Sequence, residues 1–425
     1  MKVRFPSVLA GTLALLWLAP MFCSAQQSLT WDQVKTRFEA NNPALRADEL
    51  SVEEMKAAEI TAFLRPNPQF TASTDGSQIA PHNGIWQPLA GTQVQGSLSY
   101  LHERDRKREL RRDSAREGTQ ITASQHEDLK RTMEFSLRSL FVQVLQAKAV
   151  LALAKADLEY YDKIIAISRD RLRAGDIAQI DFDRIELLRV QYESEIQAAE
   201  VTLRTSKVQL ITMLDDHTPI DQFDVTGVFD FQDQLTSLDD VRRAALDARP
   251  DLKAAQQSIQ QAEVNHKLAL ANGSTDPTFS GWYTWNPSFN NANDQQTLGA
   301  SVNIPLRIFD RNQGEKKRTE IDITRAQRAT DQVHNQVLSD VDSAYTQVQS
   351  NLELLRPYKA KYKDQSTRVR DTVTYSYEHG GASLMDMLNA QSEYRTVQLA
   401  YLQLIGAYMT AAGQLNLAVG REVIQ

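Results

Sequence analysis

The chain has 425 residues, of which 42% are hydrophobic and 24% are charged, and its formal net charge is −7. A negative balance disfavours nucleic acid as a partner, because the phosphate backbone is bound through clustered Lys and Arg side chains. Cys23 is the only cysteine, so neither a disulfide framework nor a thiolate metal site can form within the chain. A length near 400 residues usually indicates two or three domains.

Residues 1–25 have the layout of a secretory signal peptide. Two basic residues precede an apolar run at 8–18 that is too short to span a bilayer, and residues 23–25 (CSA) suit a cleavage site. Cleavage there removes the cysteine and two positive charges, which leaves a net charge of −7 − 2 = −9. Two alternatives stay open: a membrane anchor at residues 1–25, and a lipoprotein cysteine at Cys23. No later stretch holds 18 consecutive apolar residues, so no transmembrane helix is expected.

The rest of the chain is an internal duplication. Val34 and Val241 are 207 residues apart, the segments starting at 93 (QVQGSLSYL) and 297 (TLGASVNIP) are 204 apart, and Gly175 and Gly380 are 205 apart. A period of this length is too long for a solenoid. It predicts two structural repeats, residues 26–235 and 236–425, in a pseudo-twofold protomer.

The sequence of each repeat predicts the same order of helices and strands. A short helix (31–40; 239–248) precedes a second helix (44–64; 251–272), two strands, and a long helical hairpin that turns at a glycine. The strands are expected at about 69–76, 92–101, 277–286 and 296–305. The helical hairpins are expected at about 105–214 and 312–418.

The strand segments alternate between apolar and polar side chains. In the segment 92–100, Val94, Leu98 and Tyr100 share one parity, while Gln and Ser occupy the other. This is the length and pattern of a transmembrane β-strand with a lipid face and a wet face. A half-buried strand of a soluble sandwich alternates identically, so the strands alone leave both interpretations open. The polar loop 286–294 is expected to face the outside.

The long helices carry a heptad seam. Apolar residues recur at spacings of three and four over four heptads, the pattern of a coiled coil. They are Leu137, Leu140, Val144, Ala147, Leu151, Ala154, Leu158, Tyr161 and Ile165. Residues 105–174 lack proline and as one helix would extend about 100 Å. The corresponding run 312–379 contains Pro357, where we expect a kink or an interruption.

Four membrane strands cannot close a barrel, because the smallest single-chain barrels have eight and an open edge in lipid is very costly. Several chains must therefore share one barrel. Two chains give eight strands, a barrel that side chains fill, so a conducting pore favours three or more chains.

With the tip motifs RLRAGDIAQIDFDR (171–184) and YEHGGASLMDMLNAQ (377–391), this layout resembles the TolC-type outer membrane factors over essentially the whole mature chain. The segment IPLRIFDRNQGEKKR (304–318) is similar to the strand-to-helix junction of the cobalt–zinc–cadmium branch of that family. The resemblance implies a mainly α protomer with a membrane β-barrel. It implies a homotrimer that forms one 12-stranded barrel in the outer membrane of a Gram-negative bacterium and a periplasmic α-helical barrel.

The resemblance further implies a passive efflux channel. Its partners would be a periplasmic adaptor protein, an inner-membrane pump, expected to be proton-driven, and outer membrane lipid. Heavy-metal cations are the favoured cargo, and drugs, other organic compounds or exported proteins are the alternatives. More distant alternatives are a periplasmic adaptor, which has one hairpin between β-rich domains, and a coiled-coil structural protein.

In the second hairpin, the resemblance places a gate just beyond the turn at Gly380 and Gly381. Asp386 matches the first residue of an acidic ring, and three copies around one axis would attract cations. Asn389 stands where the pattern has a second acid, which puts a double ring in doubt. A helix N-terminal acid that stabilises the macrodipole is the other interpretation of Asp386.

In the first hairpin, Gly175 marks the turn and Asp181 matches the tip acid of the family, with Asp183 and Arg184 beside it. Asp181 has the same alternative interpretation as a helix N-terminal acid. For Gly175 and Gly380 we expect the role of a helix C-cap.

Nothing in the sequence indicates an enzyme. The seven histidines (82, 102, 126, 217, 266, 334 and 379) never fall at metal-ligand spacing, and the chain contains no HExxH, Walker loop or GxSxG motif. We therefore expect no catalytic residue, cofactor or bound metal, even if the cargo is a metal ion.

Overall fold

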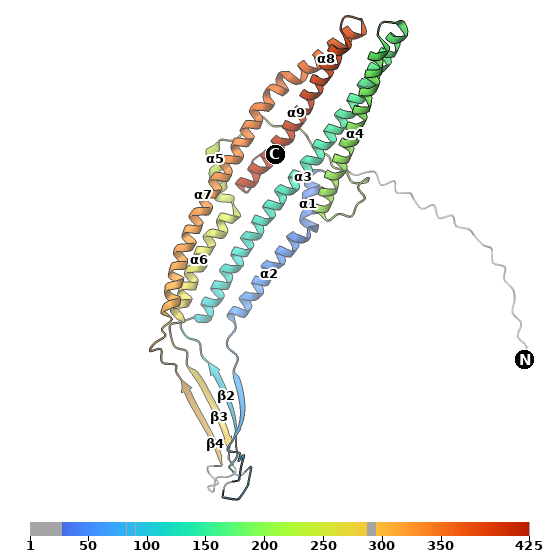
Figure 1. Ribbon diagram of the computed structural model, residues 1–425. Coiled ribbons are helices and arrows are strands. Elements are labelled where there is room, and N and C mark those ends of the chain that lie inside the picture. The colour runs from blue at the N-terminus through green and yellow to red at the C-terminus, as the bar shows by residue number, and fades with distance from the viewer. Residues whose placement is uncertain (1–27, 82, 90, 287–294, 425) are drawn as a thin grey trace, which may run out of the picture.

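The structure, a computed structural model, describes residues 28–81, 83–89, 91–286 and 295–424. The expected signal peptide at 1–25 and most of the loop at 286–294 lie outside these ranges. Figure 1 shows an elongated protomer with long helices over most of its length and four strands at one end.

The first repeat contains α1 (Trp31–Asn41), α2 (Pro43–Phe63), β1 (Gln69–Asp75), β2 (Gln93–Leu101), α3 (Lys107–Ala174) and α4 (Gln179–Leu214). The second repeat contains α5 (Leu238–Ala248), α6 (Pro250–Ala271), β3 (Thr278–Trp285), β4 (Gln296–Asn303), α7 (Gln313–Pro357), the π-helical segment η2 (Tyr358–Tyr362), α8 (Lys363–Glu378) and α9 (Leu384–Val419). The order is the same in both repeats, except that one helix of the second hairpin is divided.

The strands form one antiparallel sheet in the order β1-β2-β3-β4. Its register places Phe70 opposite Leu98, Leu98 opposite Gly281, and Gly281 opposite Ala300. Opposed residues point to the same face, so the apolar parities of the four strands join into one apolar face. The other face carries mostly Gln, Ser and Thr. Its large apolar side chains are Leu101 and Trp282, and Trp282 lies over Gly299.

The middle of the sheet is a pairing between β2 and β3, which come from different repeats. β1 and β4 are therefore its two edges, and within one chain neither edge has a further strand to pair with. An apolar face that ends in two open edges fits a sector of a larger barrel.

The helices continue the same sequential arrangement. Near the sheet, α2 packs on α3, α3 on α6, and α6 on α7, while farther along α4 packs on α3 and α9 packs on both α7 and α8 (Figure 1). Contacts between α3 and α9 join the two hairpins. α2 and α7 are the outer helices of this layer, on the same sides as β1 and β4.

Each repeat has its own hydrophobic core where the short helix crosses the long ones. In the first repeat, Val34 and Phe38 of α1 are buried against Leu137 of α3 and Leu210 of α4. The short helix thus gives the middle of the hairpin a core that two helices alone cannot form.

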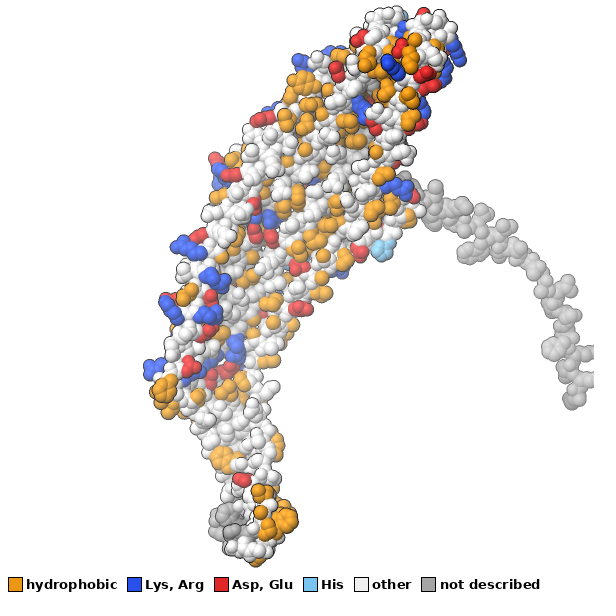
Figure 2. All heavy atoms as spheres, in the orientation of Figure 1, with side chains coloured by type: hydrophobic (Ala, Val, Ile, Leu, Met, Phe, Trp, Pro, Cys, Tyr) orange, Lys and Arg blue, Asp and Glu red, His pale blue; other side chains and the backbone are white. Residues whose placement is uncertain are grey.

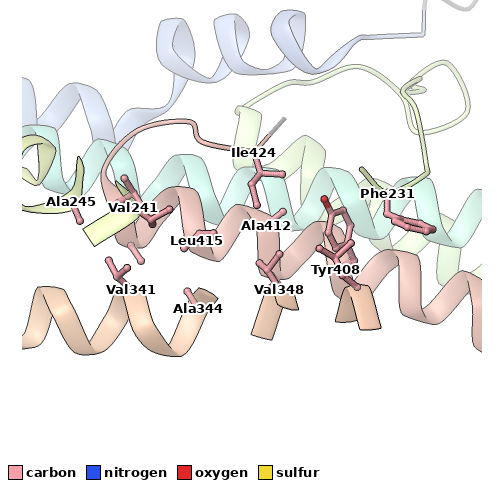
Figure 3. Close-up of a cluster of buried hydrophobic side chains, with 14 of the residues drawn as sticks. Phe231, Val241, Ala245, Val341, Ala344, Val348, Tyr408, Ala412, Leu415 and Ile424 are labelled. Carbon is pink, nitrogen blue, oxygen red and sulfur yellow. The ribbon is translucent and has the colours of Figure 1, made fainter. Parts of the chain in front are cut away.

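The second core repeats this arrangement. Val241 and Ala245 of α5 are buried with Val341 and Val348 of α7 and Leu415 of α9 (Figure 3). The equivalence of the two cores confirms the internal duplication in three dimensions.

One buried polar contact is also duplicated. Asn42, which precedes α2, donates from Nδ2 to the Met213 carbonyl at 2.9 Å, and Arg249, which precedes α6, donates from Nη1 to the Ala418 carbonyl at 3.2 Å. In both repeats, a side chain at the start of the second helix satisfies a carbonyl at the end of the returning helix, where four carbonyls lack intrahelical partners.

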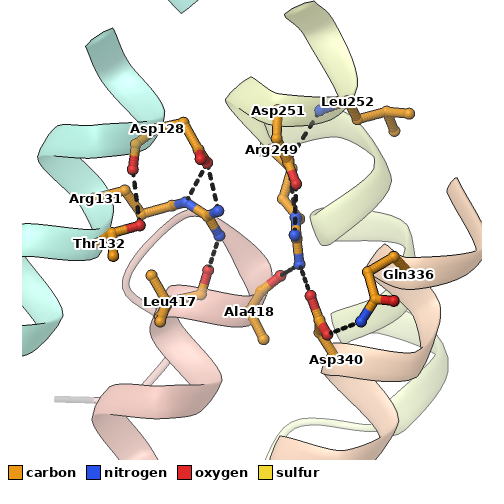
Figure 4. A network of polar contacts seen from close by, with 10 residues as sticks. All are labelled: Asp128, Arg131, Thr132, Arg249, Asp251, Leu252, Gln336, Asp340, Leu417 and Ala418. Carbon is orange, nitrogen blue, oxygen red and sulfur yellow. Dashed lines mark hydrogen bonds and ion pairs between the residues drawn. The ribbon is translucent and has the colours of Figure 1, made fainter. Parts of the chain in front are cut away.

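The polar network around Arg249 connects the repeats (Figure 4). Arg249 is buried and pairs with Asp251 at 2.6 Å and with Asp340 of α7 at 2.9 Å. Next to it, Arg131 of α3 donates to the Leu417 carbonyl of α9. The end of α9 is therefore held by charged side chains from both halves of the chain.

The two hairpins differ in continuity. α3 is one helix of 68 residues. In the second hairpin, α7 ends at Pro357 and the π-helical η2 follows directly, which confirms the interruption expected there. Proline cannot donate to the carbonyl four residues before it, and the local widening to a π-turn accommodates that loss.

Among the described helices, α3 alone contains an 18-residue window apolar enough to cross a membrane by length and composition, and 33% of that window is buried. Leu137, Phe141 and Val144 of α3 belong to the core beneath α1. A core helix passes the same test, and packing in this core accounts for the buried third of the window.

Candidate functional site: the tips of the two helical hairpins

The first hairpin turns in a left-handed glycine motif. Gly175 has φ of 83°, and its N–H donates to the Leu172 carbonyl at 3.0 Å, while the N–H of Asp176 donates to the Arg171 carbonyl at 2.9 Å. These are the two backbone bonds of a Schellman C-cap, which favours glycine because a Cβ is strained at positive φ.

The second hairpin turns in the same way, 205 positions later. Gly380 has φ of 77° and donates to the Tyr377 carbonyl at 3.1 Å, and Gly381 donates to the Ser376 carbonyl at 2.7 Å. Both turn glycines thus have the C-cap geometry expected from the sequence, whereas Gly381 itself has no positive φ.

The helix that leaves the second turn begins with a capping box. The Ser383 hydroxyl accepts from the Asp386 N–H at 3.2 Å, and the Asp386 carboxylate accepts from the Ser383 N–H at 3.1 Å and from its hydroxyl at 2.7 Å. These hydrogen bonds hold the pKa of Asp386 below its usual range, so the group is charged at neutral pH. Asp386 is exposed, and so is Asn389, one turn farther along α9.

The helix that leaves the first turn has no such cap. Ala178 occupies the N-cap position and offers no side-chain acceptor. Asp181 lies 3.9 Å from Arg184, and Asp183 accepts from Gln179 at 2.7 Å. These contacts connect neighbouring turns of α4, so the predicted acids of this tip have local partners. Within the described chain, no hydrogen bond or ion pair joins them to Asp386 or Asn389.

The residues that join the two hairpins near their tips lie on α3 and α8, and the sequence did not single them out. Tyr377 is buried, its hydroxyl lies 3.0 Å from the Ser168 hydroxyl, and its carbonyl accepts from Arg171 at 2.7 Å. The Arg171 guanidinium also lies 4.6 Å from the centre of the Tyr377 ring. Ser168 occupies the next position of the α3 heptad seam, and a polar residue in that seam was the available signal.

Apolar side chains complete this contact. Ile164 of α3, Tyr377 of α8 and Met387 of α9 form one buried cluster, and the partly buried Leu384 and Leu388 touch it and also the core of the first hairpin. The two tips are thus held by a mixed polar and apolar contact, which we call the inter-hairpin clasp (Ile164, Ser168, Arg171, Tyr377 and Met387).

A buried carboxylate lies farther from the tips, between α3 and α9. Asp157 is 3% exposed and accepts from Gln391 Nε2 at 3.4 Å, while the buried Gln391 Oε1 has no hydrogen-bond partner among the described residues. Burial raises the pKa of Asp157 to about 6, against the opposing effect of Arg395 and Arg370. Arg395 itself pairs with Glu195 of α4 at 2.5 Å.

Within the part of the chain that the structure describes, no three His, Cys, Asp or Glu side chains gather in a way that could hold a metal ion. The exposed acids at the tips are therefore separate charges on the surface of one protomer.

Comparisons with known proteins bear on this architecture. The family model described as outer membrane efflux protein matches residues 241–421. The outer membrane efflux protein BepC of Brucella suis biovar 1 (strain 1330) is 23% identical over 328 residues, which cover 74% of this chain and 69% of that protein. The second repeat thus matches the outer membrane efflux protein model, and most of the chain is similar to proteins of that description. The TolC-type resemblance seen in the sequence is thereby confirmed.

Solved structures of outer membrane proteins have the same fold as this chain. CusC superposes with a TM-score of 0.77 at 17% identity over 92% of both chains. The outer membrane protein VceC of Vibrio cholerae gives 0.73 at 16% identity, covering 93% of this chain and 97% of that one. The chain shares the fold of CusC, of the outer-membrane channel OprN and of VceC, which confirms the fold class expected from the sequence. The comparisons are with proteins of the outer membrane, which confirms the location expected from the sequence.

Proposed function

We propose that this outer membrane efflux protein is the exit channel of a tripartite system, which receives its substrate from a periplasmic adaptor and a proton-driven inner-membrane pump. The observation that carries the proposal is the sheet, because four strands with two open edges require other copies of the chain before they can enclose a pore. Three copies would give twelve strands and a conducting lumen lined by the Gln, Ser and Thr face.

The test is to purify the full-length protein from outer membranes and record single-channel currents in planar bilayers. A heat-modifiable trimer that conducts supports the proposal, as does co-purification of an adaptor and a pump after cross-linking. A soluble periplasmic monomer without conductance rejects it and favours the adaptor or structural-protein alternatives.

We infer heavy-metal cations as the cargo. The support is the similarity of residues 304–318 to the strand-to-helix junction of the cobalt–zinc–cadmium branch. A deletion strain should become sensitive to one or more of zinc, cobalt, nickel and copper, and a plasmid copy should restore resistance. If the deletion strain became sensitive to lipophilic drugs and kept its metal resistance, the cargo would be organic compounds and not metal ions.

We infer that the inter-hairpin clasp closes the periplasmic end of the channel. Opening requires the hairpins to separate at their tips, and Tyr377, Ser168 and Arg171 make the polar contacts that such a separation breaks. The second hairpin is the arm that moves, because η2 offers a weak point that α3 lacks. Population of the open state then depends on the free energy of the clasp.

We propose in addition that Asp386, with Asp181 and Asp183 at the other tip, surrounds the periplasmic aperture with negative charge. Asp386→Asn should raise conductance or relieve block by divalent cations added on the periplasmic side. Because Asp386 also caps α9, the matched control is Ser383→Ala, which removes the capping hydroxyl and keeps the charge. Asn389→Asp should strengthen the block by adding the second acid. If divalent cations blocked the wild type and the three variants equally, the acidic ring would be rejected.

The proposed signal peptide is tested by the mass of the purified protein. Cleavage after residue 25 predicts a chain that starts at Gln26, without cysteine. A chain that begins at Cys23 and carries added lipid mass would establish the lipoprotein alternative instead.

A further inference from the structure

The connection from β4 to α7 exposes an unusual group of apolar side chains. Phe309 is 89% exposed and Leu306 78% exposed, and Ile304 and Ile308 are also exposed. The loop that carries them, residues 304–312, leaves the helix-side end of β4 and projects at the junction between strands and helices (Figure 1). Exposed apolar residues that are contiguous mark a surface that contacts something other than water.

The equivalent connection in the first repeat has no such group. Residues 102–106 (HERDR) join β2 to α3 in five residues, whereas residues 304–312 (IPLRIFDRN) take nine. Since the two repeats otherwise follow the same plan, the extra length and its apolar side chains belong to the second repeat alone. A specific contact, not the fold itself, accounts for them.

The loop is shaped by its own hydrogen bonds. Asn312 donates from Nδ2 to the Ala269 carbonyl at the end of α6 at 2.8 Å, and Gln313 donates from Nε2 to the Phe309 carbonyl at 3.2 Å. The N–H of Asn312 donates to Asp310 at 2.8 Å. These bonds anchor the loop to the helices and leave its apolar side chains outward.

The position of the loop continues the apolar face of the sheet. Val302 lies on that face opposite Phe279, and Ile304 has the same parity two residues later. Where the lipid-facing strands end toward the periplasm, the membrane surface follows. Side chains just beyond the last apolar strand residue therefore lie at the level of lipid headgroups and the upper acyl chains.

The loop carries one acid, Asp310, and several cations in and around it form no ion pair among the described residues. Arg307, Arg311 and Lys316 form no ion pair within the described chain, in contrast to Lys317 and Arg318, which pair with Glu320 and Glu315. The Arg307 Nε is buried and has no hydrogen-bond partner among the described atoms. Three further cations at the same junction are also without ion pairs: Arg65, Arg104 and Arg106. Figure 2 shows basic and apolar side chains together at the lower left of the helical part.

We propose that the loop 304–312 inserts Leu306, Ile308 and Phe309 into the periplasmic leaflet of the outer membrane, where Arg307, Arg311 and Lys316 bind the headgroup of an anionic phospholipid. The apolar side chains supply burial, and the cations hold a phosphate at the depth where Arg and Lys side chains reach the interface. This inference rests on the outer membrane location of the protein and is independent of the proposed cargo and pump.

The insertion is tested with an environment-sensitive fluorophore on a single cysteine. Phe309→Cys in a Cys23→Ala background is labelled, and the full-length trimer is reconstituted into vesicles of phosphatidylethanolamine and phosphatidylglycerol. Two positions serve as controls: Leu298→Cys on the apolar face of the sheet, 86% exposed in the protomer, and Ile180→Cys at the first tip, 61% exposed. Nitroxide-labelled lipid should quench the fluorescence of the label at 309, as it does that of the label at 298. Iodide, which stays in water, should quench the label at 180 but not the label at 309.

Two results overturn the insertion. Quenching by iodide alone would place the loop in water. Protection from both quenchers would show that a second copy of the chain covers it, since β4 and α7 lie at the open edge of the protomer.

The headgroup is tested in the same vesicles by comparing nitroxide-labelled phosphatidylglycerol with nitroxide-labelled phosphatidylcholine. The wild-type loop should prefer phosphatidylglycerol by about fivefold for each cation engaged, and high salt should weaken the preference. Changing Arg307, Arg311 and Lys316 together to Gln should abolish it, and Arg311→Gln alone should reduce it.

The matched control changes Lys253, Lys361 and Arg368 to Gln, which removes the same charge from exposed side chains without ion pairs far from the junction. That variant should keep the wild-type preference. Equal quenching by the two lipids in the wild type, or an equal loss in both triple variants, would overturn the headgroup assignment.

Discussion

The two hairpins of this protein share one plan and differ in two details. Both turn at a left-handed glycine with the same two backbone bonds, 205 positions apart. The first contains an unbroken helix of 68 residues and starts its return helix without a side-chain cap. The second is interrupted at η2 and starts its return helix with a capping box.

The gate proposed above gives the two copies of one duplicated unit different roles. The first hairpin has the continuity of a rigid arm. The second has a weak point at η2, two-thirds of the way along, and a firmly capped tip beyond it. Such an arm can bend as a unit at η2 without unwinding at the turn, which is what a gate requires.

The largest effect is expected from Tyr377→Ala. Loss of the buried ring and its contacts to Ser168 and Arg171 should weaken the clasp by about 3–5 kcal/mol and shift the channel toward the open state. Single-channel recording should show higher mean conductance or longer openings. Tyr377→Phe keeps the ring and should cost only about 1 kcal/mol. Leu172→Ala, at the equivalent position of the first hairpin, is the control, and an equal increase there would argue against a special role for Tyr377.

Two substitutions can remove the helix interruption from the second hairpin or introduce one into the first. Pro357 is equivalent to Ala152, 205 positions earlier. Pro357→Ala should remove the weak point, stabilise the helix by up to about 3 kcal/mol and reduce channel opening. Ala152→Pro should break α3 at the matching level at a similar cost. Bilayer recordings and thermal unfolding measure both. Unchanged opening in Pro357→Ala would mean that η2 is not the bending point.

Asp157 makes stability depend on pH. Its pKa in the folded chain, about 6, lies above the ordinary value of 3.8. The folded state therefore binds the proton more tightly, and stability falls as pH rises from about 4 to about 6, by up to about 3 kcal/mol. Asp157→Asn should flatten that part of the pH profile of thermal unfolding and raise stability at neutral pH. Asp162→Asn on the same helix, which removes an exposed carboxylate paired with Arg189, should do neither.

The smallest effects are expected at the caps. Ser383→Ala should destabilise the start of α9 by about 1 kcal/mol, and Ala178→Ser should give the first hairpin a comparable cap. Hydrogen exchange of the first-turn amides of α9 and α4 measures each change locally. A loss of protection that spreads along the whole second hairpin would show that the cap supports more than its own turn.

Much of the fold was predictable from the sequence, because its signals are periodic. Alternation in the segment 92–100 predicted a strand with one apolar face, the seam from Leu137 to Ile165 predicted the long helix, and Pro357 predicted its interruption in the second repeat. The turn glycines were predictable since few other residues tolerate a positive φ.

The candidate site was less predictable, because it depends on contacts between distant segments. Tyr377 meets Ser168 across 209 positions, and no local pattern encodes that pairing. In the sequence, nothing distinguishes Asp157 from the other acidic residues. Only the packing of α9, which buries it against Gln391, makes it unusual. The acids at the tips were found by resemblance, and their role in the assembled channel stays a prediction, because it depends on three copies around one axis.

Spin-label distances between the copies of the trimer test the central claim, that the second hairpin is the moving arm, most directly. A single label at Ile180 reports the first tip, and one at Met385 reports the second, each in a Cys23→Ala background. If the second hairpin moves, the label at 180 gives one narrow distance, and the label at 385 gives a broad or two-component distribution that Pro357→Ala narrows. Equal breadth at both tips, or a distribution at 385 that Pro357→Ala leaves unchanged, would contradict it.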